Sequence, residues 1–161
     1  MFGIKNKMLL SLILLFSIFA LSSAYFIQYV LKHQPCNLCL IERIPYIFSI
    51  VITSIYLFTN KFEKLSLIVL SLIFFSATLI AFYHFGIEQG FIKESLVCDL
   101  NNESDILSKE ALLNQLKKMP VSCKDVTFRI FGLSLATFNI LINLILGVTT
   151  TKLFLIYEKN R

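Results

Sequence analysis

Four cysteines are the residues of this chain best suited to chemistry, and they form two pairs. Cys36 and Cys39 form a CxxC in the stretch "KHQPCNLCLIERIPY", whereas Cys98 and Cys123 are separated by 24 residues. A CxxC holds two thiols close enough to form a disulfide and to exchange it. The spacing alone leaves three interpretations open, which are a metal site, a structural crosslink and a redox pair.

The residues around the CxxC discriminate between these interpretations. Structural zinc usually needs four Cys or His ligands, and the nearest further candidate is His33, because the second cysteine pair is not a CxxC. Attachment of c-type haem requires CxxCH, whereas Leu40 follows Cys39 here. A crosslink that closes only two residues stabilises a fold very little. We therefore expect no metal, and a redox role for Cys36 and Cys39.

The second pair is less specific when it is considered alone. A disulfide between Cys98 and Cys123 would close a loop whose crosslinking is worth about 3 kcal/mol, so a structural role and an exchange role are equally compatible with it. Beside a CxxC, however, a relay through two disulfides becomes the better interpretation.

The elements that must position these cysteines follow from the distribution of charge. The chain is 57% hydrophobic and 16% charged, and no Asp, Glu, Lys or Arg occurs in 8–31, 44–60, 65–87 or 130–151. A helix of roughly 20 residues crosses the apolar core of a bilayer. The sequence therefore predicts an all-α membrane protein, a bundle of four transmembrane helices that forms one domain over 1–161.

Two segments between the predicted helices, 32–43 and 88–129, carry all four cysteines. In the longer segment, Ser108–Met119 is predicted to form a short amphipathic helix, capped by Ser108 and stopped by Pro120. This helix could lie on the membrane surface or pack on the loop and helix ends, and the pattern does not distinguish these roles.

The basic residues predict an orientation. If both termini are cytoplasmic, the entire net charge of +5 falls on the cytoplasmic side. We therefore expect a multi-pass membrane protein whose cysteine loops all lie outside, in the compartment where disulfides persist. The start of the chain imitates a signal peptide, but its apolar run continues through Tyr25–Leu31, which favours a retained helix. The basic character reflects topology and contact with anionic lipid, and it is no argument for a nucleic-acid partner.

Three polar residues are predicted to lie near the CxxC at the outer membrane edge. The threading of the helices places Gln28 at the end of the first helix, Arg43 at the start of the second and His84 at the end of the third. Each has an ordinary alternative, because an arginine can extend to lipid headgroups and a buried His or Gln can simply be hydrogen-bonded. Together they predict a pocket for a lipid-soluble electron acceptor.

Two further expectations concern this pocket. The positive end of the second helix, with Arg43 nearby, is expected to favour the thiolate of Cys39. The phenylalanines of the third helix are expected to line the pocket, namely Phe74, Phe75 and Phe82.

The sequence resembles the bacterial disulfide bond formation protein B (DsbB) family over nearly its whole length. The resemblance is carried by "PCNLCLIER" after the first predicted helix, by the two loop cysteines, and by "FRIFGLSLATFN" (Phe128–Asn139) at the fourth. It implies a thiol:quinone oxidoreductase of the bacterial inner membrane, with its cysteine loops in the periplasm, that reoxidises a periplasmic DsbA-like thioredoxin-fold protein. Many relatives carry Trp in the loop, whereas this chain has none, so the details of partner docking are expected to differ.

The resemblance also implies a role for each cysteine. A reduced partner would attack the Cys98–Cys123 disulfide, and Cys98 would take the mixed disulfide. Cys123 would then exchange with Cys36, and Cys39 would meet the quinone, either ubiquinone or menaquinone.

Three further positions match residues near the quinone in this family, namely Arg43, His84 and Gln28. A guanidinium is suited to bonding a quinone oxygen and to stabilising developing negative charge.

Two other classes remain as alternatives. One is a non-catalytic membrane protein whose disulfides only brace its outer loops. The other is a four-helix quinone reductase of the vitamin K epoxide reductase kind, but that group carries its membrane CxxC on a later helix.

Overall fold

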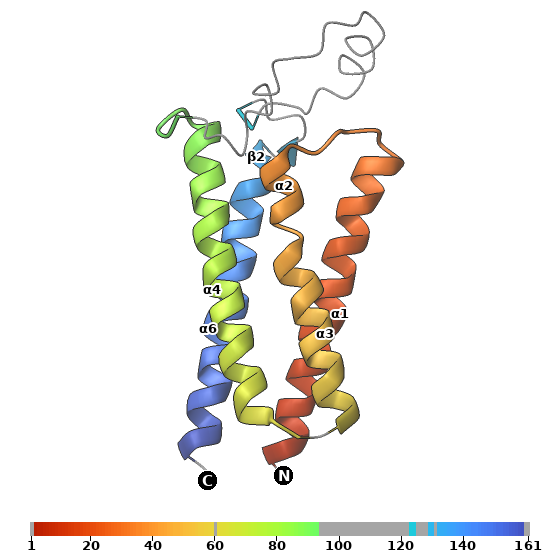
Figure 1. The fold of residues 1–161 in the computed structure, drawn as a ribbon, viewed down its shortest axis with the longest axis vertical. Coiled ribbons are helices and arrows are strands. Elements are labelled where there is room, and N and C mark those ends of the chain that lie inside the picture. Colours follow the sequence, from red (N-terminus) through yellow and green to blue (C-terminus); the bar gives the residue numbers. More distant parts are fainter. Residues whose placement is uncertain (1, 60, 94–122, 125–128, 131, 160–161) are drawn as a thin grey trace, which may run out of the picture.

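The computed structural model describes residues 2–59, 61–93, 123–124, 129–130 and 132–159. Four of its helices are long and apolar enough to cross a membrane, which confirms the predicted all-helical, multi-pass architecture (Figure 1). The long helices are α1 (Phe2–Tyr29), α3 (Ile44–Thr59), α4 (Glu63–Glu88) and α6 (Leu135–Lys159). A short helix, α2 (Asn37–Ile41), precedes α3 and extends the second candidate span to Asn37–Thr59.

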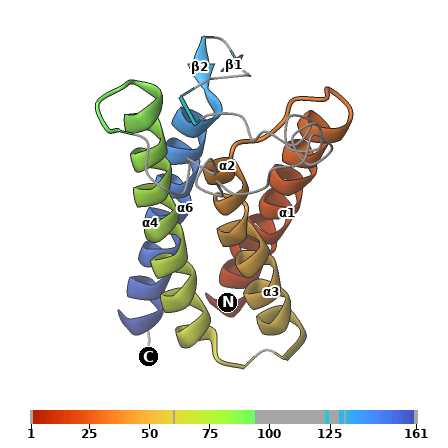
Figure 2. The ribbon, with the colours of Figure 1, turned by 45° about the horizontal axis from the view of Figure 1, so that its top comes forward.

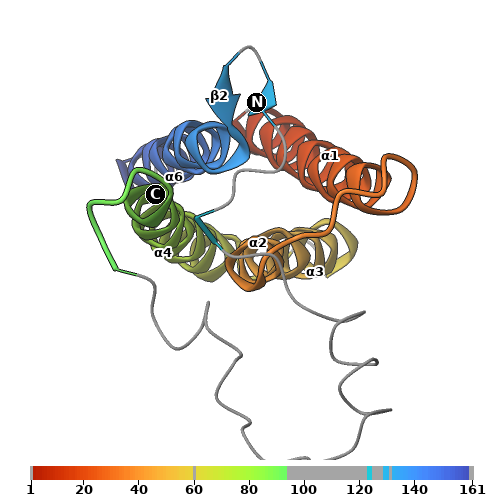
Figure 3. The ribbon, with the colours of Figure 1, turned by 90° about the horizontal axis from the view of Figure 1, so that it is seen from above.

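The helices pack as neighbouring pairs, which Figure 3 shows end-on. α4 packs mainly on α6, α1 packs on α3, and α3 also packs on α4. Small hydroxyl residues lie at two of these contacts, where Ser17 bonds Ser49 at 3.2 Å and Ser71 bonds Thr151 at 2.7 Å. Small side chains allow close approach of helix backbones, and a hydroxyl pair adds an interhelical hydrogen bond in the membrane.

A buried apolar cluster holds the half of the bundle that contains both termini. It joins residues of all four long helices: Leu10, Ile13, Tyr56, Leu67, Leu70, Phe74 and Leu153. The outward side chains are also apolar, as shown by Phe58 at 86% exposed and Leu79 at 72% exposed. Such an outer surface suits contact with lipid rather than with water.

The second span is interrupted between α2 and α3, and Pro45 explains the interruption. A proline ring clashes with the carbonyl of the residue four positions earlier, which is Ile41, the last residue of α2. Proline is tolerated in the first turn of a helix, where Pro45 stands in α3. The break leaves Glu42 and Arg43 as a two-residue link at the end of the bundle opposite the two termini (Figure 1).

The fourth helix begins later and ends later than the sequence predicted. A hairpin of β1 (Arg129–Ile130) and β2 (Leu133–Ser134) occupies the predicted first turn, and α6 starts only at Leu135 (Figure 2). Gly132 has φ +82° in the hairpin connection, a backbone conformation that does not continue a helix. At its other end α6 runs to Lys159 rather than 151, because charged residues can continue a helix beyond the apolar core and extend to water.

The other predicted spans differ from the structure only at their ends, and α1 begins earlier, at Phe2. The predicted amphipathic helix at Ser108–Met119 and the position of Cys98 lie outside the described residues.

Candidate redox-active site

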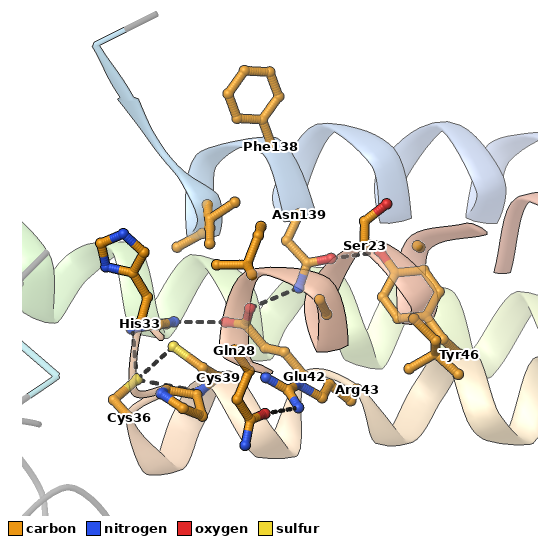
Figure 4. Close-up of a pocket in the computed structure, with 18 of the residues that line it drawn as sticks. Ser23, Gln28, His33, Cys36, Cys39, Glu42, Arg43, Tyr46, Phe138 and Asn139 are labelled. Atoms are coloured by element: carbon orange, nitrogen blue, oxygen red, sulfur yellow. Dashed lines mark hydrogen bonds and ion pairs between the residues drawn. The ribbon is translucent and has the colours of Figure 1, made fainter. Parts of the chain in front are cut away.

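The CxxC lies at the start of α2, and Cys36 caps that helix (Figure 4). Its Sγ accepts a hydrogen bond of 3.3 Å from the backbone N–H of Cys39. The two sulfur atoms are 2.7 Å apart, and both residues are free thiols. Two thiols held this close can be joined or separated with little movement of the chain.

The contacts of Cys36 stabilise its thiolate form. The hydrogen bond with the Cys39 thiol, followed by contacts with His84, lowers the pKa of Cys36 to about 4, although burial opposes the shift. The sequence-based expectation placed the favoured thiolate at Cys39. In the structure, Cys36 is the residue whose sulfur receives the N–H at the helix start.

His84 of α4 lies directly behind Cys36 and is 3% exposed. Its Nε2 is 3.5 Å from the Sγ of Cys36, and its Nδ1 is 2.8 Å from Oε1 of Glu42. A carboxylate accepts hydrogen bonds, so this contact places the imidazole proton on Nδ1 and leaves Nε2 facing the thiol. The site therefore holds a row of thiol, imidazole and carboxylate.

Glu42 is bonded on its other side to α6. Its Oε2 accepts a hydrogen bond of 2.7 Å from Nδ2 of Asn139. Asn139 in turn accepts one of 2.5 Å from the hydroxyl of Tyr46 and one of 2.8 Å from Nδ2 of Asn143. This network connects the link after α2 to α3, α4 and α6.

Arg43 points to α1, away from the Glu42 network. Its Nη1 donates a hydrogen bond of 2.6 Å to Oε1 of Gln28, and its guanidinium lies 4.9 Å from the centre of the Tyr25 ring. A cation over an aromatic face is attracted by the ring, so two contacts from one helix fix this guanidinium. Gln28 is thereby identified as a direct partner of Arg43.

These groups line a single pocket of about 390 Å³. The structure brings five of the predicted site residues into its wall: Gln28, Cys36, Cys39, Arg43 and His84. The pocket is larger than about 300 Å³, the lower end of the usual range for small-molecule sites. Most of its apolar wall comes from α1 and α6, including Phe16, Phe19, Ala24, Ile27, Phe138 and Ile142.

The expectation that three phenylalanines of α4 line this pocket was wrong. Phe74 is fully buried in the cluster at the other half of the bundle. Phe82 is 61% exposed and Phe75 is 38% exposed, and none of the three belongs to the pocket wall. These residues were chosen because they are hydrophobic. The rotation of α4 about its axis, however, directs them to the core of the bundle or to lipid.

Cys123 shares the environment of the CxxC. It is 2% exposed, is disulfide-bonded, and belongs to one buried cluster with Cys36, Leu38 and Ile87. It also contributes to the pocket wall. The structure thus brings a residue of the second cysteine pair beside the first.

The ligand atoms of Cys36, Cys39 and His84 lie within 4.8 Å of one another. Zinc–sulfur bonds of about 2.3 Å in a tetrahedral site hold two sulfur atoms roughly 3.7 Å apart. The observed separation of 2.7 Å is shorter than this, and it is closer to the spacing of two thiols that can form a disulfide.

Comparison with known proteins identifies the family. The family described as "Disulfide bond formation protein DsbB" matches residues 6–153 of the chain. The chain belongs to the DsbB family. A Rickettsia prowazekii (strain Madrid E) protein, "Uncharacterized protein RP370", is 30% identical over 158 residues, which cover 97% of this chain and 91% of that protein. No solved structure gives a significant match.

Membership in the DsbB family implies disulfide oxidoreductase activity in a membrane. The family typically uses a quinone and implies a DsbA-like partner.

Three residues of the site were not predicted from the sequence, namely Glu42, Tyr46 and Asn139. Two local signals could have pointed to them. Glu42 is the acidic residue nearest the CxxC at a membrane edge, and Asn139 and Asn143 are four residues apart in a segment without charge. Polar groups at such depth usually find partners on neighbouring helices.

Proposed function

We propose that this protein is a thiol:quinone oxidoreductase that reoxidises a DsbA-like dithiol protein and passes the electrons to a membrane quinone. The observation that carries the proposal is the position of the Cys36–Cys39 pair. It stands in the wall of a largely apolar pocket that also contains Arg43 and His84. The bound quinone would take up two electrons and two protons to become a quinol.

The pocket suits such a molecule by its chemistry. A quinone has a planar ring, two carbonyl oxygens and, in the membrane, an apolar tail. The apolar side chains of α1 and α6 match the ring and tail, and the Arg43 guanidinium can donate to a carbonyl oxygen. Among the described helices, α1 and α6 are not one of the closely packed pairs, so a lipid-soluble molecule could enter between them.

The electrons would travel through both cysteine pairs. A reduced partner attacks Cys98 of a Cys98–Cys123 disulfide, and the released Cys123 attacks Cys36, which breaks the Cys36–Cys39 bond. The packing of Cys123 with Cys36 in one buried cluster supports the second step. The partner's second thiol would then release Cys98, whose thiolate attacks Cys123, re-forms the Cys98–Cys123 disulfide and frees Cys36. Cys36 and Cys39 would now both be thiols, and on rejoining they would give two electrons and two protons to the quinone.

The partner would have to meet these cysteines on the oxidising side of the membrane. We propose the bacterial inner membrane, with both termini in the cytoplasm and the CxxC at the periplasmic edge. The concentration of the net positive charge on the side of the termini supports this orientation.

A quinone-reduction assay tests this function. Purified protein in detergent is mixed with a reduced DsbA-like protein and a short-chain ubiquinone or menaquinone, and the loss of quinone absorbance is followed. We expect rapid reduction by the wild type and none by Cys39→Ser. Unchanged reduction in this variant would refute the proposed route.

A trapping experiment separates the proposal from a protein whose disulfides only brace its loops. In Cys123→Ala, the mixed disulfide between Cys98 and the partner cannot be resolved by Cys123, so we expect it to accumulate. Absence of this species, together with thiols that do not react, would favour the structural alternative.

A further inference from the structure

Glu42 is a buried acidic side chain at the edge of a membrane bundle, 8% exposed. Both of its oxygens are hydrogen-bonded, Oε1 with His84 of α4 and Oε2 with Asn139 of α6. A carboxylate removed from water is costly unless it is paired and hydrogen-bonded. The surrounding helices meet that requirement, so Glu42 is held in one place and orientation.

The position of Glu42 gives His84 a defined chemical role. With its Nδ1 proton directed at the carboxylate, the neutral ring can accept a proton only at Nε2, which faces the Cys36 sulfur at 3.5 Å. A carboxylate behind an imidazole fixes its tautomer and stabilises the imidazolium that forms when it takes a proton. The same three group types, in this order, activate nucleophiles in many enzymes.

The row also leads to the place where the electrons would be delivered. Figure 4 shows Cys36, Cys39, Glu42 and Asn139 around the pocket, and His84 also belongs to its wall. A proton that leaves the Cys36 thiol therefore need not pass through the lipid or the bulk solvent to reach a quinone in this pocket.

We propose that Glu42 is a positioning residue that holds His84 ready to take the proton of Cys36 and to return it to the reduced quinone. This inference rests on the proposed quinone function. In the balanced step, two thiols become one disulfide, and two electrons and two protons convert the quinone to a quinol. The proton of Cys36 travels through His84, whose imidazolium is stabilised by Glu42 until the proton reaches a quinol oxygen.

Other titratable groups face this row, and the pH experiments must allow for them. One of them is Glu88, whose Oε1 is 3.7 Å from Nε2 of His84, beyond hydrogen-bond distance. The groups that face Glu42 and His84 from the surrounding elements are Cys36 and Cys39 at α2, Tyr46 of α3, Glu88 of α4 and Asn139 of α6.

A purely structural role is the competing explanation, because Glu42 also joins α4 to α6. The two roles differ in what Glu42→Gln changes. The amide keeps the shape and can still form hydrogen bonds, but it removes the charge that stabilises the imidazolium. A structural role predicts a lower free energy of unfolding and an unaltered titration of Cys36.

The test follows the alkylation of Cys36 against pH in the reduced protein, resolved by peptide mass spectrometry, with no quinone present. In Glu42→Gln we expect the midpoint of Cys36 alkylation to rise by at least about one pH unit, since a nearby charge shifts a pKa by about 1–3 units. We also expect quinone reduction by reduced partner to slow about 10²-fold, the lower end for loss of acid–base assistance. Glu158→Gln, the same change at the opposite end of the bundle where Glu158 pairs with Lys64, should leave both unchanged.

The outcomes separate the inference from the function on which it rests. If Glu42→Gln keeps the wild-type midpoint of Cys36, the positioning role is wrong, even when the wild type reduces quinone. If the wild type fails to reduce quinone, the proposed function is wrong, whatever the titration shows.

A second variant covers the case in which Glu42→Gln does not fold. His84→Gln removes the ring through which Glu42 acts, so the Cys36 midpoint must rise there too, and an unchanged midpoint would overturn the relay. Where both variants fold, the double variant should react with quinone no more slowly than His84→Gln. Additive losses would contradict an action of Glu42 through His84.

Discussion

Replacement of Gln28 by Leu is expected to weaken quinone binding although Gln28 itself need not touch the quinone. The Oε1 of Gln28 accepts a hydrogen bond of 2.6 Å from Arg43. Leu has a similar size but no acceptor, so the change frees the guanidinium while it largely preserves the packing of α1. Arg43 then keeps only its contact with the Tyr25 ring, 4.9 Å away.

The magnitude follows from the two contacts of Arg43. A hydrogen bond to a charged group is worth about 1.5–3 kcal/mol, and the lower end applies because both residues are only half-buried. The contact with Tyr25 is worth about 0.5–1 kcal/mol, since that ring is 43% exposed, and it limits the freedom that Arg43 gains. With about 1.4 kcal/mol for each factor of ten, we expect the KM for quinone to rise about 5- to 10-fold, with kcat changed less.

The assay measures quinone reduction at saturating reduced partner over a range of short-chain quinone concentrations. Gln89→Leu is the matched control, because Gln89 ends α4 at the same edge of the bundle but does not belong to the pocket wall. We expect this control to keep the wild-type KM.

A double-mutant cycle tests the reasoning directly. Arg43→Lys lacks the planar fork, and in that background Gln28→Leu should raise the KM by less than twofold, since its action passes through the guanidinium. An unchanged KM in Gln28→Leu alone, or a full additional loss in the double variant, would refute the role assigned to Gln28.

Three further outcomes are expected. The pKa of Cys36 is lowered to about 4 in the folded protein, so its thiolate stabilises the reduced protein fully above about pH 8.5, and this stabilisation is lost as the pH falls to about 4. Alkylation of Cys36 should therefore persist down to about pH 5. An alkylation rate that falls tenfold per pH unit below about pH 8 would contradict the lowered pKa. Tyr46→Phe should lower the free energy of unfolding in detergent by about 0.5–1.5 kcal/mol. Asn139→Leu should lower it by about 3 kcal/mol or more, because this change removes the hydrogen bonds of Asn139 to both Glu42 and Tyr46. Equal losses in the two variants would refute the network. Gly147→Ala should leave the free energy of unfolding unchanged or raise it by up to about 1 kcal/mol, since the added Cβ lies 3.5 Å from the Phe75 ring, an ordinary contact distance. A fall in the free energy of unfolding by more than about 1 kcal/mol would show that the helices pack more tightly here than this distance indicates.

The sequence predicted those site residues that stand in a recognisable local pattern. The CxxC, the charged pair after it, and the polar residues at the ends of apolar segments identified Cys36, Cys39, Arg43, His84 and Gln28, which the structure brings into one pocket. Helix direction alone fixes the depth of each residue in a membrane, and depth was sufficient to group them.

Other features of the site depended on contacts that no local pattern reveals. Glu42 joins residues that are 42 and 97 positions away along the chain, so its partners follow only from the packing of α4 and α6 beside α2. The assignment of the thiolate to Cys36 depended on where α2 begins, because Cys36 rather than Cys39 caps its first turn. The pocket phenylalanines were predicted wrongly because hydropathy does not report how a helix is rotated about its axis.

The sequence by itself determined that the chain crosses a membrane four times and carries its CxxC at one edge. This was possible because burial in lipid imposes a requirement on each segment separately. Only the tertiary structure decided that a carboxylate, an imidazole and a thiol form one row beside an apolar pocket. Hydrogen bonds need partners a few ångströms apart and correctly oriented, and those distances are set by helix packing rather than by order along the chain.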